Sequence, residues 1–170
     1  EQALEGGVKA IQLREKDLGG KALFDLAEKM RELCDRYDAL LLINDRIDVA
    51  LAVDAAGVQL NKTSLPISAA RALLGAQKLI GASTHSLDEA RQAQSSGVDF
   101  VLFGPVYFTP SKASFGAPQG LDALKKIVAN LRVPVYAIGG IKPENIIDVH
   151  SVGVRGVALI SAIIGSDRPK

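Results

Sequence analysis

The chain has 170 residues, enough for one sizeable hydrophobic core, and its 20 Lys and Arg against 19 Asp and Glu give a formal net charge of +1. This balance excludes a general attraction to nucleic acid or to an anionic membrane surface, and the absence of Trp argues against a stacking platform for single strands. The single cysteine, Cys34, excludes an internal disulfide, and no apolar run approaches the roughly 20 residues of a membrane span, so we expect a cytoplasmic protein.

Apolar runs alternate with helical patterns along the whole chain. Ser86 and Glu89 have the spacing of a capping box, which predicts the start of a helix. In chain order the pattern predicts a strand at 8–14, a helix at 21–37, a strand at 39–44, a helix at 46–54, a strand at 57–60, a helix at 68–74, a strand at 78–83, a helix at 86–94, a strand at 99–106, a helix at 120–130, a strand at 133–138, a helix with Pro143 in its first turn and Gly153 at its end, and a strand at 155–160.

A helix follows every predicted strand but the last, and a repeat of roughly 20–25 residues implies parallel strands joined by crossovers. Seven such units predict an α/β fold, a (β/α)8 TIM barrel that forms a single domain over residues 1–170. We expect the first strand of this barrel to precede Glu1 and its last helix to lie outside the chain. The alternative is an open doubly wound sheet, but no G-x-G-x-x-G follows any strand.

The stretch 11–17 ends an apolar run and then becomes densely charged. Because strand residues alternate between two faces, Gln12 and Arg14 point to the same side. Polar side chains on the inner face of a buried strand need a partner, which at the carboxyl end of a parallel strand is commonly a ligand. The alternative at this point is a structural ion pair between Arg14 and Asp45.

Cations follow separate strand ends, where a barrel would bring them to one space. Several cations with neutral hydrogen-bond donors, in a chain of nearly zero net charge, suit a polyanion such as diphosphate. For the two lysines, which lie in loops, the alternative is an ordinary solvated surface. The cations are Arg14, Lys16 and Lys112, and the neutral donors are Gln12, Asn44 and Ser83.

Small residues follow the last two predicted strands, as Gly139-Gly140 and as Ile160-Ser161. Loops in these positions of a barrel commonly bind phosphate through backbone N–H groups, which requires small residues for close approach. The pattern therefore predicts a phosphate site there.

Asp45 is a carboxylate beside Asn44. Hard oxygen ligands near a diphosphate fit Mg²⁺, which commonly takes one or two carboxylates together with phosphate oxygens and water. The alternative is that Asp45 caps the helix that begins at Arg46, and both roles can hold together. His85, between a strand end and a helix cap, is either a site residue or a structural one.

Seven stretches of the chain form a recognisable series: QLREK (12–16), LLINDRIDVALAVDAAGVQL (41–60), IGASTHSLDEA (80–90), FGPVYFTPSK (103–112), GLDAL (120–124), VPVYAIGGI (133–141) and ALISAI (158–163). They resemble the family of thiamine phosphate synthase and its close relative, the aminothiazole tautomerase. The resemblance implies the barrel fold and a homodimer. It also implies a Mg²⁺-dependent transferase that joins an aminopyrimidine methyl diphosphate to a thiazole phosphate and releases diphosphate.

Motif by motif, the resemblance also implies roles for single residues. Asp45 would ligate Mg²⁺, Ser83 would contact the leaving diphosphate, and Lys112 would close over it. The diphosphate would be held by Gln12, Arg14, Lys16 and Asn44, and the thiazole phosphate by Thr109, Ser111, Gly139, Gly140, Ile160 and Ser161.

The chain departs from the family pattern at three positions. Synthases have a second acidic metal ligand in a Gly-Gln-x-Asp pattern, where this chain has Ser64 in place of the acid and Lys62 in place of the Gln. Phe108 stands where the family usually has Pro. At position 105 this chain has Pro, which agrees with the synthases, whereas the tautomerase has a catalytic His there. The alternatives to a synthase are therefore a tautomerase-like isomerase and a non-catalytic binding paralogue.

Overall fold

The computed structural model describes residues 1–110 and 117–166, and the chain divides into two compact units, Glu1–Ile80 and Gly81–Ser166. Seven strands form a parallel sheet whose order follows the chain, from β1 to β7. A doubly wound sheet reverses its strand order at a switch point, whereas a barrel does not. The order therefore favours the predicted TIM-barrel-like α/β fold over the open sheet.

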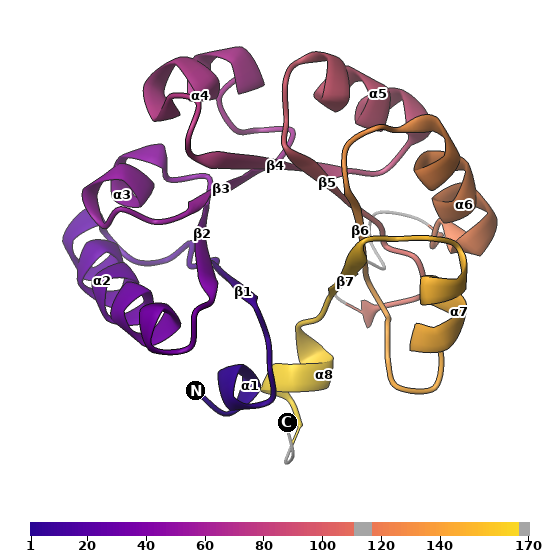
Figure 1. Ribbon diagram of the computed structural model, residues 1–170, viewed down its shortest axis with the longest axis horizontal. Coiled ribbons are helices and arrows are strands. Elements are labelled where there is room, and N and C mark those ends of the chain that lie inside the picture. Colours follow the sequence, from indigo (N-terminus) through magenta and orange to yellow (C-terminus); the bar gives the residue numbers. More distant parts are fainter. Residues whose placement is uncertain (111–116, 167–170) are drawn as a thin grey trace. The chain divides into compact units, whose positions relative to one another are not determined.

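The first unit alternates strands and helices from the start of the chain. Leu23, Ala27 and Cys34 lie on the buried face of its longest helix, against the apolar run of the second strand. Figure 1 shows α2 and α3 along one side of strands β1 to β3. The elements are α1 (Gln2–Glu5), β1 (Ala10–Leu13), α2 (Gly20–Arg36), β2 (Leu40–Asn44), α3 (Ile47–Ala52), β3 (Gly57–Leu60), α4 (Ile67–Leu74) and the start of β4 (Leu79–Thr84).

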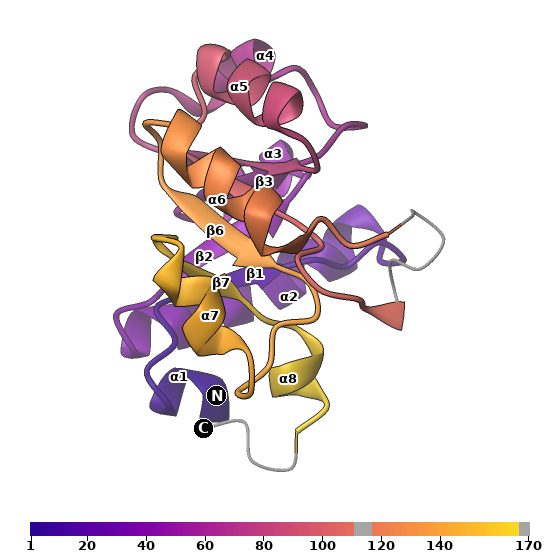
Figure 2. The ribbon, with the colours of Figure 1, turned by 90° about the vertical axis from the view of Figure 1, so that its right-hand side faces the viewer.

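The second unit continues the same alternation. Phe103 is fully buried, as are Leu124 and Ile127 of the helix that follows it, so sheet and helices share one apolar layer. Figure 2 shows α6 and α7 beside strands β6 and β7. The elements are the rest of β4, α5 (Leu87–Ser95), β5 (Phe100–Phe103), α6 (Gly120–Asn130), β6 (Val135–Ile138), α7 (Ile146–Ser151), β7 (Gly156–Ala158) and α8 (Ser161–Ile164).

The predicted capping box is confirmed with one difference. The Ser86 hydroxyl oxygen accepts a hydrogen bond from the Glu89 backbone N–H at 3.1 Å. The Glu89 carboxylate accepts from the backbone N–H of His85 at 2.7 Å, one residue before the position that a capping box uses. The acid still satisfies a free N–H at the helix start.

Several predicted boundaries were wrong for physical reasons. The strand predicted at 99–106 ends at Phe103, because Pro105 has no N–H for the ladder. The helix predicted to have Pro143 in its first turn begins only at Ile146. The two helices α1 and α8, four residues each, are too short to produce a periodic pattern.

Three features of the predicted fold stay predictions: the single domain, the strand expected before Glu1 and the final helix expected outside the chain. In the part of the chain that the structure describes, no helix is long and apolar enough to cross a membrane.

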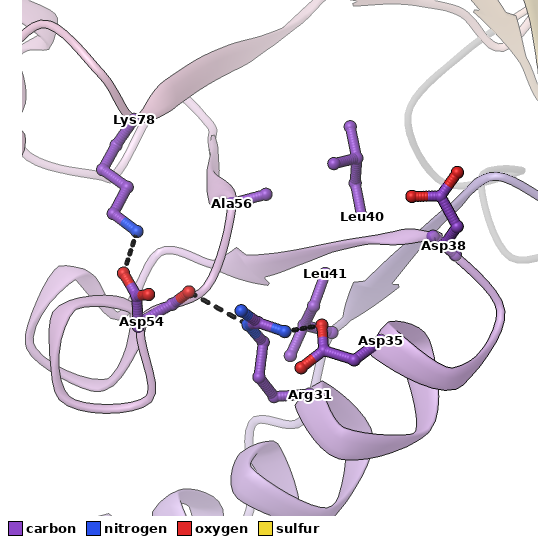
Figure 3. A pocket seen from close by; sticks show the side chains of 9 residues that line it. Arg31, Asp35, Asp38, Leu40, Leu41, Asp54, Ala56 and Lys78 are labelled. Atoms are coloured by element: carbon purple, nitrogen blue, oxygen red, sulfur yellow. Dashed lines mark hydrogen bonds and ion pairs between the residues drawn. The ribbon is translucent and has the colours of Figure 1, made fainter.

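A pocket of about 340 Å³ lies in the first unit at the amino ends of the strands (Figure 3). Arg31 forms an ion pair with Asp35 and donates from Nε to the Asp54 carbonyl at 3.0 Å. Lys78, just before β4, forms an ion pair with the Asp54 carboxylate. These contacts fasten α2, the turn before β3 and the start of β4 to one another, so we interpret the charges of this pocket as structural.

Asp54→Asn should reduce stability in a pH-dependent way. Lys78 lowers the pKa of Asp54 through a hydrogen bond and its charge. A lowered folded-state pKa stabilises above the ordinary carboxyl pKa, and this contribution disappears as the pH falls through the lowered value. Asn tolerates the left-handed backbone of residue 54 (φ +52°). Thermal unfolding should therefore show a lower Tm for the variant at pH 7 and no difference in strong acid.

Asp38→Asn is the matched control for this prediction. Asp38 lines the same pocket with a similar backbone (φ +50°), and within the described residues it forms no ion pair. Its substitution should leave the pH dependence of Tm unchanged. An Asp54 effect of equal size at every pH would contradict the electrostatic explanation.

Candidate active site

The predicted residues of the first unit lie at or just beyond the carboxyl ends of β1 and β2. We call Gln12, Arg14, Lys16, Asn44 and Asp45 the first-unit cluster. Gln12 and Asn44 are half-buried, and the Gln12 side chain donates from Nε2 to the Asn44 Oδ1 at 3.1 Å. The structure therefore brings together the two neutral donors that the sequence placed on neighbouring strands.

The two cations of this cluster are exposed. The prediction that Arg14 belongs to the strand is wrong, because β1 ends at Leu13 and Arg14 lies in the loop. Among the described residues, neither the Arg14 nor the Lys16 side chain forms an ion pair. The structural pair between Arg14 and Asp45 is thus not formed, and both cations can meet an anion from solvent.

Asp45 has an unusual backbone. Its φ of +66° lies in the left-handed region, which Asp tolerates better than most residues. Its backbone N–H donates to the Gln59 carbonyl of β3 at 3.0 Å, which fixes the turn to the sheet. The alternative that Asp45 caps the next helix is wrong, because the cap position is Arg46 and no side chain makes a cap hydrogen bond there. The carboxylate is left exposed to solvent.

The Arg46 guanidinium binds Asp48 through two hydrogen bonds of 2.9 and 2.6 Å, and the nearby charge of Asp45 also helps to raise the pKa of Arg46 after the larger effect of Asp48. These bonds hold the pKa of Asp48 below its ordinary value.

The loop after β3 folds on itself. The Ser64 hydroxyl oxygen accepts from the Asn61 backbone N–H at 2.8 Å. The Asn61 Oδ1 in turn accepts from the backbone N–H and the hydroxyl of Thr63, at 2.8 and 2.7 Å. No group of three or more His, Cys, Asp and Glu that could hold a metal occurs in residues 1–110 and 117–166. Asp45 is one of the exposed carboxylates at this end of the first unit.

The glycine pair that follows β6 forms the centre of the second unit's candidate site. Gly139 and Gly140 have φ values of +98° and +66°. Among the described residues, neither of their N–H groups donates a hydrogen bond. Successive free N–H groups in such a turn form an anion-binding concavity, which suits the predicted phosphate.

The loop after β5 packs directly against this turn. The backbone N–H of Val106 donates to the Ile138 carbonyl, and that of Tyr107 donates to the Gly139 carbonyl, both at 3.0 Å. A Cβ on Gly139 would lie 2.6 Å from the Pro105 Cα, and one on Gly140 would lie 2.5 Å from the Phe108 carbonyl oxygen. Only glycine fits at these two positions.

The remaining candidates of the second unit lie around these loops. His85 is tied to the backbone, because its Nδ1 forms a short hydrogen bond with the Gly104 carbonyl. Ser83 and Thr109 are half-buried, whereas Ile160 and Ser161 are exposed where β7 gives way to α8. Ser111 and Lys112 lie outside the described residues.

Comparisons with known proteins point to one family. The model of the thiamine monophosphate synthase family matches residues 1–163. A thiamine-phosphate synthase of Chlorobium luteolum is 46% identical over 169 residues, which cover 99% of this chain and 80% of that protein. One from Moorella thermoacetica is 44% identical over 164 residues, which cover 96% of this chain and 78% of that protein. The solved thiamine phosphate pyrophosphorylase of Pyrococcus furiosus is 42% identical with a TM-score of 0.91, covering 99% of this chain and 80% of that one.

Gly139→Ala should destabilise the protein more than Gly153→Ala. Both positions have a left-handed backbone, with φ of +98° and +87°. At Gly153 a Cβ would meet only a Val128 methyl at 3.6 Å. Gly153→Ala should therefore lower the free energy of unfolding by about 1–2 kcal/mol, the cost of the left-handed backbone alone. At Gly139 the overlap with Pro105 should add about 1–3 kcal/mol. Urea unfolding of both variants measures the difference, and equal losses would show that the close approach is unimportant.

Proposed function

The chain belongs to the thiamine monophosphate synthase family, and we propose that it couples hydroxymethylpyrimidine diphosphate with thiazole phosphate to give thiamine phosphate and diphosphate. It is an enzyme of thiamine biosynthesis of the transferase type. The observation that carries the function is the family match over residues 1–163, together with relatives at 44–46% identity that bear this activity in their names.

The first-unit cluster is the proposed site for the diphosphate. The exposed guanidinium of Arg14 and the ammonium of Lys16 supply charge, and neither is engaged by an acid among the described residues. The Gln12–Asn44 pair supplies neutral hydrogen-bonding groups held at a fixed place by their mutual bond. Charge-assisted bonds to phosphate oxygens are about twice as strong as neutral ones, so the cations would dominate binding.

The glycine turn is the proposed site for the phosphate of the thiazole. Its two free N–H groups can donate to phosphate oxygens, and the packed loop after β5 keeps the turn in this form. Thr109, Ser111, Ile160 and Ser161 complete the proposed set.

The reaction exchanges a carbon–oxygen bond for a carbon–nitrogen bond. The bond between the pyrimidine methyl carbon and the diphosphate oxygen breaks, and diphosphate leaves with the electron pair. The thiazole nitrogen then donates its lone pair to the methyl cation that remains. In this proposal Ser83, Arg14 and Lys112 stabilise the negative charge that develops on the leaving diphosphate.

Mg²⁺ fits this cluster as an ion that the substrate helps to hold. Asp45 offers one exposed carboxylate on a fixed turn, and Mg²⁺ commonly takes one or two carboxylates with phosphate oxygens and water. When bound, the ion would neutralise charge on the leaving diphosphate. Ser64 adds no carboxylate, and its hydroxyl is already used by Asn61.

The residue at one position disfavours the tautomerase alternative. The position of its catalytic His is Pro105 in this chain, and the nearby His85 uses Nδ1 to bind the Gly104 carbonyl. That bond holds His85 to the loop after β5 through Nδ1 alone, so the evidence against the tautomerase is the absence of a histidine at position 105. A homodimer and a cytoplasmic location remain predictions of the proposal.

The wild-type protein should release diphosphate only when both substrates and Mg²⁺ are present. A coupled phosphate assay measures the release, and Arg14→Met should lower kcat/KM by about 10–100-fold, the effect of losing one charged contact of about 1.5–3 kcal/mol. Isomerisation of a thiazole carboxylate phosphate without diphosphate release would support the tautomerase. Tight ligand binding without either reaction would support the binding paralogue.

Ser64→Asp should strengthen Mg²⁺ binding. The substitution adds a second carboxylate where the family pattern has an acid, and more carboxylates favour a hard cation. Isothermal titration of Mg²⁺ into the protein with diphosphate should show tighter binding by about tenfold, which corresponds to about 1.4 kcal/mol. Thr63→Asp, one residue away, is the control for a general charge effect. Equal tightening in both variants would show that geometry at position 64 is irrelevant.

A further inference from the structure

We propose that Asn145 is the positioning residue of the glycine turn: it holds the free N–H groups of Gly139 and Gly140 together for the phosphate of the thiazole substrate. This inference rests on the proposed function and adds a residue that the predicted site did not contain. It starts from two hydrogen bonds that a single side chain makes.

Asn145 uses both ends of its amide on the backbone of the turn. Its Nδ2 donates to the Gly140 carbonyl at 3.1 Å, and its Oδ1 accepts from the Lys142 backbone N–H at 2.9 Å. The side chain is half-buried. The two bonds close the chain between residues 140 and 145 into a small loop that is pinned at its start and in its middle.

The position of Asn145 in the fold shows that the side chain is directed to the turn. Asn145 is the N-cap residue of α7, a place where Asn commonly accepts a hydrogen bond from the helix. Here it makes no side-chain cap bond. The side-chain amide of Asn145 therefore bonds to the segment from Gly140 to Lys142 and does not cap the helix.

The turn is held from its other side by the loop after β5. Tyr107 donates to the Gly139 carbonyl, and a Cβ on Gly140 would overlap the Phe108 carbonyl oxygen. With Asn145 on the Gly140 carbonyl, both carbonyl groups of the pair are bound and both N–H groups are free, in the part of the chain that the structure describes. The arrangement directs donors, and not acceptors, to a ligand.

Two adjacent glycines form a flexible turn, so additional hydrogen bonds are needed to hold its conformation. Glycine has the widest choice of backbone conformations, so an unrestrained pair loses the most entropy when it is ordered around a ligand. A turn that is ordered beforehand avoids this cost when it binds. Removing Asn145 should therefore weaken phosphate binding without removing any group that touches the phosphate.

Asn145→Ala in the full chain tests this role, with Asn130→Ala as the matched control. Asn130 also donates from Nδ2 to a backbone carbonyl, that of Lys126 at 2.9 Å, but it lies at the end of α6 away from the turn. Losing one net hydrogen bond of about 1.4 kcal/mol corresponds to a tenfold change in binding. We expect Asn145→Ala to raise the KM for thiazole phosphate about tenfold and to leave the KM for the pyrimidine diphosphate within about twofold. Asn130→Ala should change neither KM.

Three outcomes overturn the inference. The first is an unchanged KM for thiazole phosphate in Asn145→Ala. The second is an equal rise in both KM values with a fall in Tm, which would show a merely structural role. The third is the same loss in Asn130→Ala. Two measurements separate this inference from the proposed function. If the wild-type protein releases no diphosphate in the coupled assay, the proposed function is refuted. If isothermal titration gives Asn145→Ala the same Kd for inorganic phosphate as the wild type, the positioning role of Asn145 is refuted.

Discussion

Contact between backbones, without any side chain between them, is the constraint on which the second unit's candidate site depends. A Cβ on Gly104 would lie 2.0 Å from the carbonyl oxygen of Ile138, the last residue of β6. Just beyond β6, a Cβ on Gly139 would overlap Pro105, and one on Gly140 would overlap the Phe108 carbonyl oxygen. Gly104 after β5 and the pair Gly139-Gly140 after β6 thus let the end of β5 and its loop lie against the end of β6. In this arrangement the Gly139 carbonyl accepts from the Tyr107 backbone, the Gly140 carbonyl accepts from the Asn145 side chain, and the N–H groups of the turn are left for a ligand.

The first unit reaches a comparable result by different means. Its turn is fixed by a left-handed Asp45, whose N–H is tied to the Gln59 carbonyl, and not by glycine. Gln12 and Asn44 are held by their own bond. In each unit, hydrogen bonds hold the backbone at the carboxyl ends of the strands, and some groups there have no partner among the described residues: the charged ends of Arg14 and Lys16, and the N–H groups of Gly139 and Gly140. Ligand sites of parallel α/β sheets lie at this end because the ladder stops there and its polar groups need other partners.

The sequence was sufficient to predict the elements whose signal is local. The strand at 57–60 and the helix at 120–130 have the predicted bounds, because a short apolar run and an amphipathic period do not depend on distant residues. The position of the glycine pair after a strand predicted a phosphate site, and that site stays a prediction. The role of Asn145 was not predictable, because its partner carbonyl is set by the path of the turn. The competing explanations for Asp45, an ion pair or a helix cap, could not be separated without knowing where β1 and α3 begin and end.

The distribution of charge in the first unit separates the stabilising end from the proposed binding end. At the amino ends of the strands, Arg31 and Lys78 are each paired with an aspartate, so these charges satisfy one another (Figure 3). At the carboxyl ends, Arg14 and Lys16 form no ion pair within the described residues. Both are exposed, so water stabilises them at little cost and no acid has to be displaced when an anion arrives. Glu15, Asp17 and Asp45 are also exposed at this end. A chain with a net charge of only +1 would therefore attract diphosphate through direct contact with Arg14 and Lys16, and not through a local excess of positive charge.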